Sequence, residues 1–191
     1  MRIIGVDPGS VVTGIGVIEF TDDDKVKLLD HDVLMMNSRM PMTVRIKKVY
    51  DIIIRKLSEY KPEELAIETQ FFGKNVQSTL KLGQIKGTVI IAALNSFVNV
   101  VEYSPREIKK SVTGSGASSK QQVQYMVKTI LSMRSDKIPG DVSDALAIAL
   151  CHHYSVTGAS TGLKNLKRKG NCRGTWKEFL ENNPSKIYRK K

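Results

Sequence analysis

Several features are scarce in this chain of 191 residues. It has only two cysteines, Cys151 and Cys172, which are too few for a disulfide framework and which we expect to be reduced. Its apolar runs, such as TVIIAAL, are far shorter than the ~18 residues that a membrane span needs. An aspartate interrupts the opening MRIIGVDPGS where a secretory signal would be apolar. We therefore expect a cytoplasmic protein with no membrane partner.

Acidic residues are also scarce, because 30 Lys and Arg face 19 Asp and Glu, for a net charge of +11. Residues 155–191 carry ten basic and two acidic side chains, which leaves only +3 for residues 1–154. A basic protein suggests a polyanionic partner, but a solvated lysine-rich end explains this excess equally well. The small polar stretch SVTGASTG at 155–162 predicts a linker. The sequence thus predicts one domain over 1–154 and a basic linker and tail over 155–191.

Apolar runs and turn residues predict the order of the elements. We expect strands at 2–7, 14–20 and 26–36, a helix at 43–60, a strand at 64–68, a helix at 75–96, a strand at 98–104, and helices at 105–112, at 119–133 and from about 139. A meander followed by alternating helices and strands favours a three-layer α/β fold around a mixed sheet. Gly83 and Gly87 flatten one side of the long helix, which predicts close packing on the sheet, with dimer contact as the second choice.

Four carboxylates stand where such a fold forms sites. Asp7 and Glu68 each end an apolar strand, and Asp141 and Asp144 share one helix face. If the two strands are parallel neighbours and the helix starts over the same edge, the four groups meet. Carboxylate oxygens select hard cations such as Mg²⁺ or Mn²⁺, and two ions about 3.5–4 Å apart suit phosphoryl transfer. Taken singly, each acid also fits a turn, a strand end or a helix cap.

Three stretches, IIGVDPGSVVTGIGVI, LAIETQFFGKNVQSTLKLGQIKG and DVSDALAIALCHH, resemble the RuvC family of Holliday junction resolvases, in the ribonuclease H-like superfamily. The resemblance covers residues 1 to about 154 and implies a ribonuclease H-like fold with a five-stranded mixed sheet flanked by helices. It implies that two Mg²⁺ ions, for which Mn²⁺ substitutes, bind a catalytic set made of Asp7, Glu68, Asp141 and Asp144. The implied reaction is hydrolysis of DNA phosphodiesters to 5′-phosphate and 3′-hydroxyl ends.

The resemblance also implies a surface for four-way junction DNA. Its expected members are Phe71, Phe72, Lys74, Lys109, Lys110 and Lys120. Phe71 matches the aromatic residue that the family places at the junction, and Phe72 would then pack into the core. The alternative is that both phenylalanines are buried. Lys109 and Lys120 align with basic residues near the scissile phosphate, where they would also serve catalysis, and Lys110 competes with Lys109.

Partners follow from the same resemblance. It implies a homodimer, since symmetric junctions need paired cuts on opposed strands. It also implies a branch-migration motor complex of the RuvA and RuvB type. Three rival interpretations stay open: an actin-like or sugar-kinase ATPase, to which DPGSVVTGIG is loosely similar; a related nuclease for other branched nucleic acids; and a non-catalytic junction-binding protein.

Two further patterns lie near the end of the chain. Cys151, His152, His153 and Cys172 match no standard zinc spacing, and we interpret the histidines as the end of a helix, where histidine is favourable. In the tail, WKEFL predicts one helical turn with an apolar face between basic arms.

Overall fold

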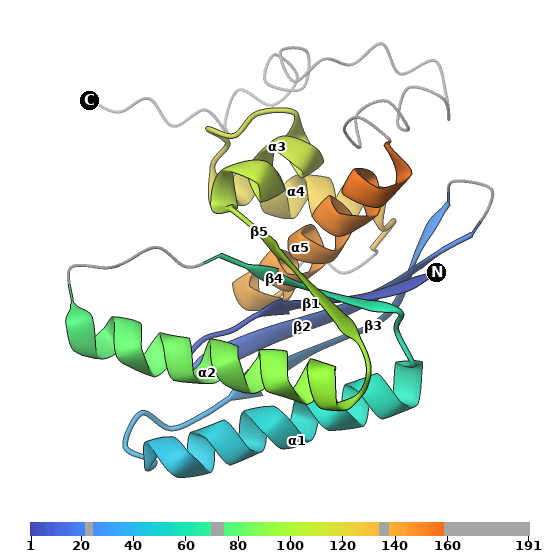
Figure 1. Ribbon diagram of the computed structural model, residues 1–191. Coiled ribbons are helices and arrows are strands. Elements are labelled where there is room, and N and C mark those ends of the chain that lie inside the picture. The colour runs from blue at the N-terminus through green and yellow to red at the C-terminus, as the bar shows by residue number, and fades with distance from the viewer. Residues whose placement is uncertain (22–24, 70–74, 134–137, 159–191) are drawn as a thin grey trace, which may run out of the picture.

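The computed structural model describes residues 1–21, 25–69, 75–133 and 138–158 (Figure 1). The elements are β1 (Arg2–Asp7), β2 (Val12–Phe20), β3 (Val26–Met35), α1 (Met42–Tyr60), β4 (Glu64–Glu68), α2 (Val76–Asn95), β5 (Asn99–Tyr103), α3 (Pro105–Thr113), α4 (Lys120–Ile130) and α5 (Gly140–Thr157). This is the predicted order of strands and helices. Both short helices begin with a capping box, built on Ser104 and on Ser119, which explains why α3 and α4 start where they do.

The strands form one mixed sheet in the order β3-β2-β1-β4-β5. Short connections join β1, β2 and β3, which are antiparallel, whereas helical crossovers bring β4 and β5 in parallel to β1. Val6 lies beside Ile67 in the parallel pair, so Asp7 and Glu68 end adjacent strands at the same edge. The expected neighbour relation of these two strands is confirmed.

Helices cover both faces of the sheet, with α1 and α2 on one side and α3, α4 and α5 on the other (Figure 1). Because side chains alternate along a strand, each strand contributes to two separate cores. Ile4, Val6 and Ile67 are buried in the core with α1 and α2. Ile3 and Ala66 are buried in the core with α3, α4 and α5. The three-layer α/β architecture is confirmed.

Glycines allow α5 to lie directly on the sheet. A Cβ atom on Gly5 would come within 2.1 Å of the Ala145 carbonyl oxygen, and one on Gly14 within 2.0 Å of the Asp141 carbonyl oxygen. Only a residue without a side chain permits such an approach of two backbones. Gly14 is also the partner of Asp7 in the β1–β2 ladder, so the start of α5 rests beside Asp7.

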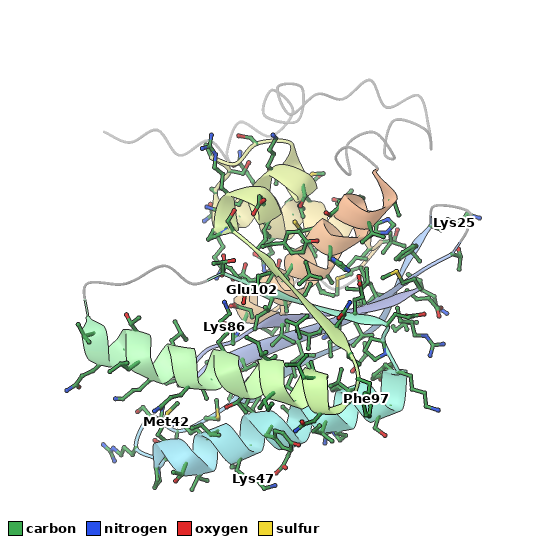
Figure 2. The ribbon with its side chains drawn as sticks, in the orientation of Figure 1. Lys25, Met42, Lys47, Lys86, Phe97 and Glu102 are labelled. Carbon is green, nitrogen blue, oxygen red and sulfur yellow. The ribbon has the colours of Figure 1, made fainter. Side chains whose placement is uncertain are left out.

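The expected packing of Gly83 and Gly87 against the sheet is wrong. A Cβ atom at either position would meet no atom of the described chain within 4 Å. α2 packs on the sheet through its opposite side, which includes Ile85 and Val89. Apolar residues flank the glycines on the exposed side, namely Val76, Leu80, Ile91 and Leu94, and Phe97 beyond the helix end is 99% exposed (Figure 2). The two glycines therefore belong to an outward-facing apolar stripe.

α5 is longer than the sequence indicated. It continues to Thr157, three residues into the segment expected to be a linker. His152 and His153 consequently lie inside the helix with 2% and 1% exposure, so their assignment to a helix end is wrong. Despite the apolar character of α5, no helix in the described parts of the chain is long and apolar enough to cross a membrane.

Candidate active site

The four predicted carboxylates come from three elements that meet at one edge of the sheet. Alternation along β1 and β4 turns Asp7 and Glu68 toward α5, on the same face as Gly5 and Ala66. α5 starts just after Pro139 over this edge, and its first two turns carry Asp141 and Asp144. The fold therefore gathers the four side chains into one electrostatic cluster, as the sequence predicted.

Burial and mutual repulsion together disfavour negative charge in this cluster. Burial first, and then the neighbouring carboxylates of Asp144, Glu68 and Asp141 in that order, together raise the pKa of Asp7 from 3.8 to about 7. Burial and the Asp144 carboxylate likewise raise the pKa of Glu68, against the lysines nearby. An excess of buried negative charge is therefore built into the site, and a cation would relieve it.

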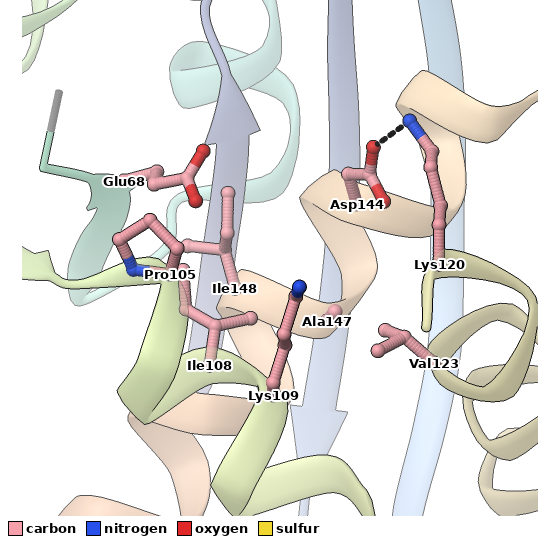
Figure 3. Close-up of a pocket in the computed structure, with 9 residues that line it drawn as sticks. All are labelled: Glu68, Pro105, Ile108, Lys109, Lys120, Val123, Asp144, Ala147 and Ile148. Atoms are coloured by element: carbon pink, nitrogen blue, oxygen red, sulfur yellow. Dashed lines mark ion pairs between the residues drawn. The ribbon is translucent and has the colours of Figure 1, made fainter. Parts of the chain in front are cut away.

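Lys120 supplies a positive charge at the rim of the cluster. Its ammonium group donates a hydrogen bond to Asp144 over 2.5 Å, and this contact raises the pKa of Lys120 (Figure 3). The capping box on Ser119 fixes the start of α4, where Lys120 is the first residue. A Cβ atom on Gly140 would crowd the Lys120 side chain at 3.3 Å. Because Gly140 has no side chain, the Lys120 side chain has room to reach Asp144.

A pocket of about 270 Å³ opens beside the carboxylates (Figure 3). Its lining consists of Glu68, Pro105, Ile108, Lys109, Lys120, Val123, Asp144, Ala147 and Ile148. Lys109 is half-buried there and lowers the pKa of Glu68, whereas Lys110 is exposed and does not line the pocket. Of these two competing lysines, the structure places Lys109 at the site.

The donor chemistry of the cluster fits a hard divalent cation, since all four side chains offer carboxylate oxygens. The elevated pKa of Asp7 is the structural sign of that fit, because metal binding compensates clustered anions. Among the described residues, no three acidic, histidine or cysteine side chains converge tightly enough to hold an ion as they stand. Asp144 is instead engaged with Lys120. Ion binding therefore requires these side chains to adjust.

Two supports of the site were missed in the sequence. Arg45 of α1 is 6% exposed and donates hydrogen bonds to the carbonyl oxygens of Ser10 (2.8 Å) and Met40 (3.1 Å). Thr13, fully buried, donates to the Gly9 carbonyl oxygen over 3.0 Å. Together they hold the loop that follows Asp7. The supporting role of Arg45 could not be recognised in the sequence, because an arginine in an amphipathic helix is usually solvated.

Glycines inside strands did carry a signal. The pattern TGIG in β2 places Gly14 and Gly16 two residues apart on one face, and the pattern GVD in β1 places Gly5 on the same face as Asp7. Glycine within a strand often marks the close approach of another backbone, and here that backbone belongs to α5. Phe71, Phe72, Lys74, Cys172 and the WKEFL segment lie outside the described residues.

Comparison with known proteins gives consistent matches. The family model described as crossover junction endodeoxyribonuclease RuvC matches residues 3–152. A crossover junction endodeoxyribonuclease RuvC from Chloroherpeton thalassium is 44% identical over 187 residues, covering 98% of this chain and 99% of its own. The structure of Thermus thermophilus RuvC matches with a TM-score of 0.75 and 32% identity, covering 84% of this chain and 99% of its own. T. thermophilus RuvC in complex with a Holliday junction substrate matches with the same TM-score and 30% identity, covering the same shares of the two chains.

Proposed function

This chain belongs to the RuvC family of crossover junction endodeoxyribonucleases, and we propose that its four clustered carboxylates are the catalytic centre. It has the ribonuclease H-like fold, and it is a metal-dependent endonuclease that resolves Holliday junctions in recombination and DNA repair. The observation that carries the assignment of the centre is Asp7. Its carboxyl is partly buried at the end of β1, with a pKa of about 7, among three other acids. A protein keeps such repulsion where function needs it.

The ions in this proposal are two Mg²⁺, which Mn²⁺ can replace, held by Asp7, Glu68, Asp141 and Asp144. Bound there, divalent ions supply Lewis-acid activation of water and neutralise charge on the leaving 3′ oxygen. The protein's part is to fix the carboxylates on a rigid strand edge and helix start. Asp144 must release the Lys120 ammonium group to serve as a ligand, which frees that lysine for a phosphate.

The surface beside the carboxylates suits a DNA backbone. The segment 105–130, which holds α3 and α4, carries five basic residues and one acid. Lys109 and Lys120 line the pocket next to Glu68 and Asp144, where ammonium groups can hold the scissile phosphate and stabilise its developing charge. Phe71, Phe72 and Lys74 follow Glu68 in the sequence. We assign these three residues to contacts with unpaired bases and phosphates at the crossover.

Adjacent lysines offer a matched test of this phosphate contact. Lys109→Ala should lower kcat for junction cleavage by about 10²-fold, because charge in the transition state loses a partner. Lys110→Ala removes the same charge from the same turn of α3 but lies outside the pocket, so kcat should stay within a few-fold. Equal losses in the two variants would contradict a specific role for Lys109.

A second copy of this chain is the proposed partner of the α2 stripe. The stripe is exposed and apolar, and Gly83 and Gly87 let another helix approach closely. A two-fold pair of identical stripes forms a self-complementary contact and presents two active sites to the opposed strands of a symmetric junction. The partnership with a branch-migration motor of the RuvA and RuvB type stays a prediction.

Oligomeric state tests this assignment directly. Leu80→Glu places a charge in the stripe and should convert dimers to monomers in sedimentation experiments at micromolar concentration. Val156→Glu places the same charge on an exposed apolar position of α5 and should leave the dimer intact. Dimerisation that survives Leu80→Glu would exclude α2 as the interface.

Cleavage selectivity tests the function itself. The protein with Mg²⁺ should cut a synthetic four-way junction symmetrically on opposed strands. It should leave an intact duplex and an RNA–DNA hybrid of the same sequence uncut, and Asp7→Asn should remove all cutting. Preferential cutting of the hybrid, or nicking that persists in Asp7→Asn, would overturn the proposed centre.

A further inference from the structure

A partly buried polar chain joins α5 to the sheet and begins at Glu64, the residue of β4 that is farthest along the strand from Glu68. Nε2 of His152 lies within hydrogen-bond distance of Glu64 Oε2, and Nδ1 lies 2.7 Å from the Tyr103 hydroxyl oxygen. The Ser155 side chain also hydrogen-bonds the Tyr103 hydroxyl. The His152 side chain is only 2% exposed, so its own two contacts are largely shielded from water. One α5 residue is thus bound to both β4 and β5.

The chemistry of these groups fixes the direction of each bond. The Glu64 carboxylate only accepts, so Nε2 of His152 must carry a proton and donate it. In the neutral imidazole, Nδ1 then accepts from the Tyr103 hydroxyl. Both ring nitrogens are therefore satisfied by partners on two neighbouring strands. Such a bidentate arrangement resists sliding and rotation of α5 more strongly than apolar packing, which is not directional.

The spacing of this chain matches that of the active site. Glu64 and Glu68 lie on the same face of β4, about 13 Å apart at the usual strand rise. His152 and Asp144 lie about 12 Å apart along α5 at the usual helical rise. When His152 meets Glu64, Asp144 therefore comes level with Glu68. The parallel β4–β5 register places Tyr103 directly beside Glu68, so the chain also reaches the site edge of β5.

We propose that His152, bonded between Glu64 and Tyr103, is a positioning residue that sets the placement of α5 on the sheet and thereby holds Asp141 and Asp144 opposite Asp7 and Glu68 for metal binding. The proposal rests on the function proposed above. Metal sites tolerate errors of only about 0.2 Å in ligand distances, and a helix free to shift by a fraction of its rise would exceed that. Packing of Gly5 and Gly14 beneath α5 sets its height, while His152 sets its position along β4.

The test measures metal binding to the free protein, with no DNA present. Mn²⁺ titrations by calorimetry should show affinity weakened about 10-fold or more in His152→Gln and in Glu64→Gln, as is usual for groups that orient metal ligands. Tyr103→Phe, which removes a single hydroxyl and keeps the ring, should weaken affinity less. The double variant of Glu64→Gln and His152→Gln should be no weaker than either single variant, since both break one chain.

His153→Gln is the matched control, because it alters the adjacent buried histidine of the same helix. His153 packs its ring on Phe20 of β2, with 4.4 Å between ring centroids. The His153→Gln variant should have a lower melting temperature, as His152→Gln should, but its Mn²⁺ affinity should be unchanged. Affinity losses that follow melting temperature across all variants, or unchanged affinity in Glu64→Gln and Tyr103→Phe, would refute the positioning role.

A separate variant distinguishes failure of this inference from failure of the proposed centre. Asp7→Asn should abolish Mn²⁺ binding if the carboxylates are the ligands. Should Asp7→Asn bind Mn²⁺ like the unaltered protein, the proposed centre itself is wrong. Should Asp7→Asn lose binding while the His152 and Glu64 variants keep it, only the positioning role is refuted.

Discussion

Strands β1 and β4 present only aliphatic side chains to α1 and α2, whereas toward α5 they present small or acidic residues, with Ile3 the one large aliphatic side chain. Toward α1 and α2 point Ile4, Val6, Leu65 and Ile67, and toward α5 point Ile3, Gly5, Asp7, Glu64, Ala66 and Glu68. The four aliphatic residues are all 0% exposed. The same two strands therefore build an apolar core on one face and the active site on the other, because successive side chains of a strand point to opposite faces.

The difference shows where this protein places stability and where it places function. The α1 and α2 side contributes burial of large apolar groups, each worth about 1.5–3 kcal/mol. On the α5 side, glycines give up packing volume, and acids with raised pKa values oppose folding at neutral pH. Substitutions on the two faces should consequently fail in different ways, and the predictions below use that contrast.

Loss of one carboxylate should have the largest effect. Asp7→Asn, Glu68→Gln, Asp141→Asn or Asp144→Asn should each lower junction cleavage by on the order of 10²–10³-fold or more, as when a transition state loses an electrostatic stabiliser. Melting temperature should stay level or rise, since repulsion in the cluster is relieved. Junction affinity measured in EDTA should persist or tighten, because anions leave the DNA-facing cleft. A variant that loses affinity and activity together would place that acid in DNA binding.

Truncation on the opposite face should damage stability instead. Ile67→Ala leaves a cavity in the core beneath α1 and α2 and should lower the free energy of unfolding by about 2–5 kcal/mol. Cleavage per folded molecule should change little, although Glu68 is the next residue. Val44→Ala, at a 41% exposed position of α1, is the control and should stay within about 0.5 kcal/mol. Urea unfolding checks both values, and a selective loss of cleavage in Ile67→Ala would break the contrast.

Much of this arrangement could be predicted because it depends on local pattern. Alternation and turn residues predicted the order of the strands along the chain, and strand ends pointed to Asp7 and Glu68. Similarity to a known family then united them with Asp141 and Asp144. The outward side of α2 was predicted wrongly, because two glycines flatten a helix in the same way whether the sheet or a partner covers it. The side of α2 that faces the sheet is set by the apolar residues opposite the glycines, such as Ile85.

Long-range polar contacts could not be predicted at all. His152 is 88 residues from Glu64 in the chain, and no spacing rule links a histidine in a helix to an acid at a distant strand start. Arg45 likewise reaches Ser10 across 35 residues. Such contacts follow from the placement of whole elements, which is known only once the sheet is assembled.

Lys120→Met should have opposite effects on catalysis and metal binding. Loss of the phosphate contact should lower cleavage, but Mn²⁺ affinity without DNA should rise because Asp144 no longer pairs with an ammonium group. The pair is partly exposed, with 65% and 28% of the two side chains accessible. Its contribution of about 1 kcal/mol corresponds to roughly 5-fold in affinity. Lys110→Met should leave Mn²⁺ affinity unchanged, and weaker binding in Lys120→Met would show that the lysine assists the ion.

The smallest expected effect is the pH dependence of stability in the metal-free protein. Asp7 titrates at about 7 when folded but near 3.8 ordinarily, so between these values the folded state binds more protons than the unfolded state. The stability that this group contributes is therefore complete below pH 4 and is lost as the pH rises through 7. Glu68, whose pKa is also raised, adds to the same slope. Glu19, Asp32 and Glu107 have lowered pKa values, so they affect stability in the opposite sense at low pH, but they do so equally in the variant and the parent.

We therefore propose to compare Asp7→Asn with the unaltered protein by urea unfolding in EDTA from pH 5 to pH 8. The stability of the variant relative to the parent should rise with pH and level off above 7, and Mg²⁺ should restore the parent. If the difference in unfolding free energy between the variant and the parent did not depend on pH, Asp7 would be ionised in the folded protein at no cost in stability. The acids on the α5 face would then not oppose folding, which would contradict the electrostatic part of the comparison between the two faces.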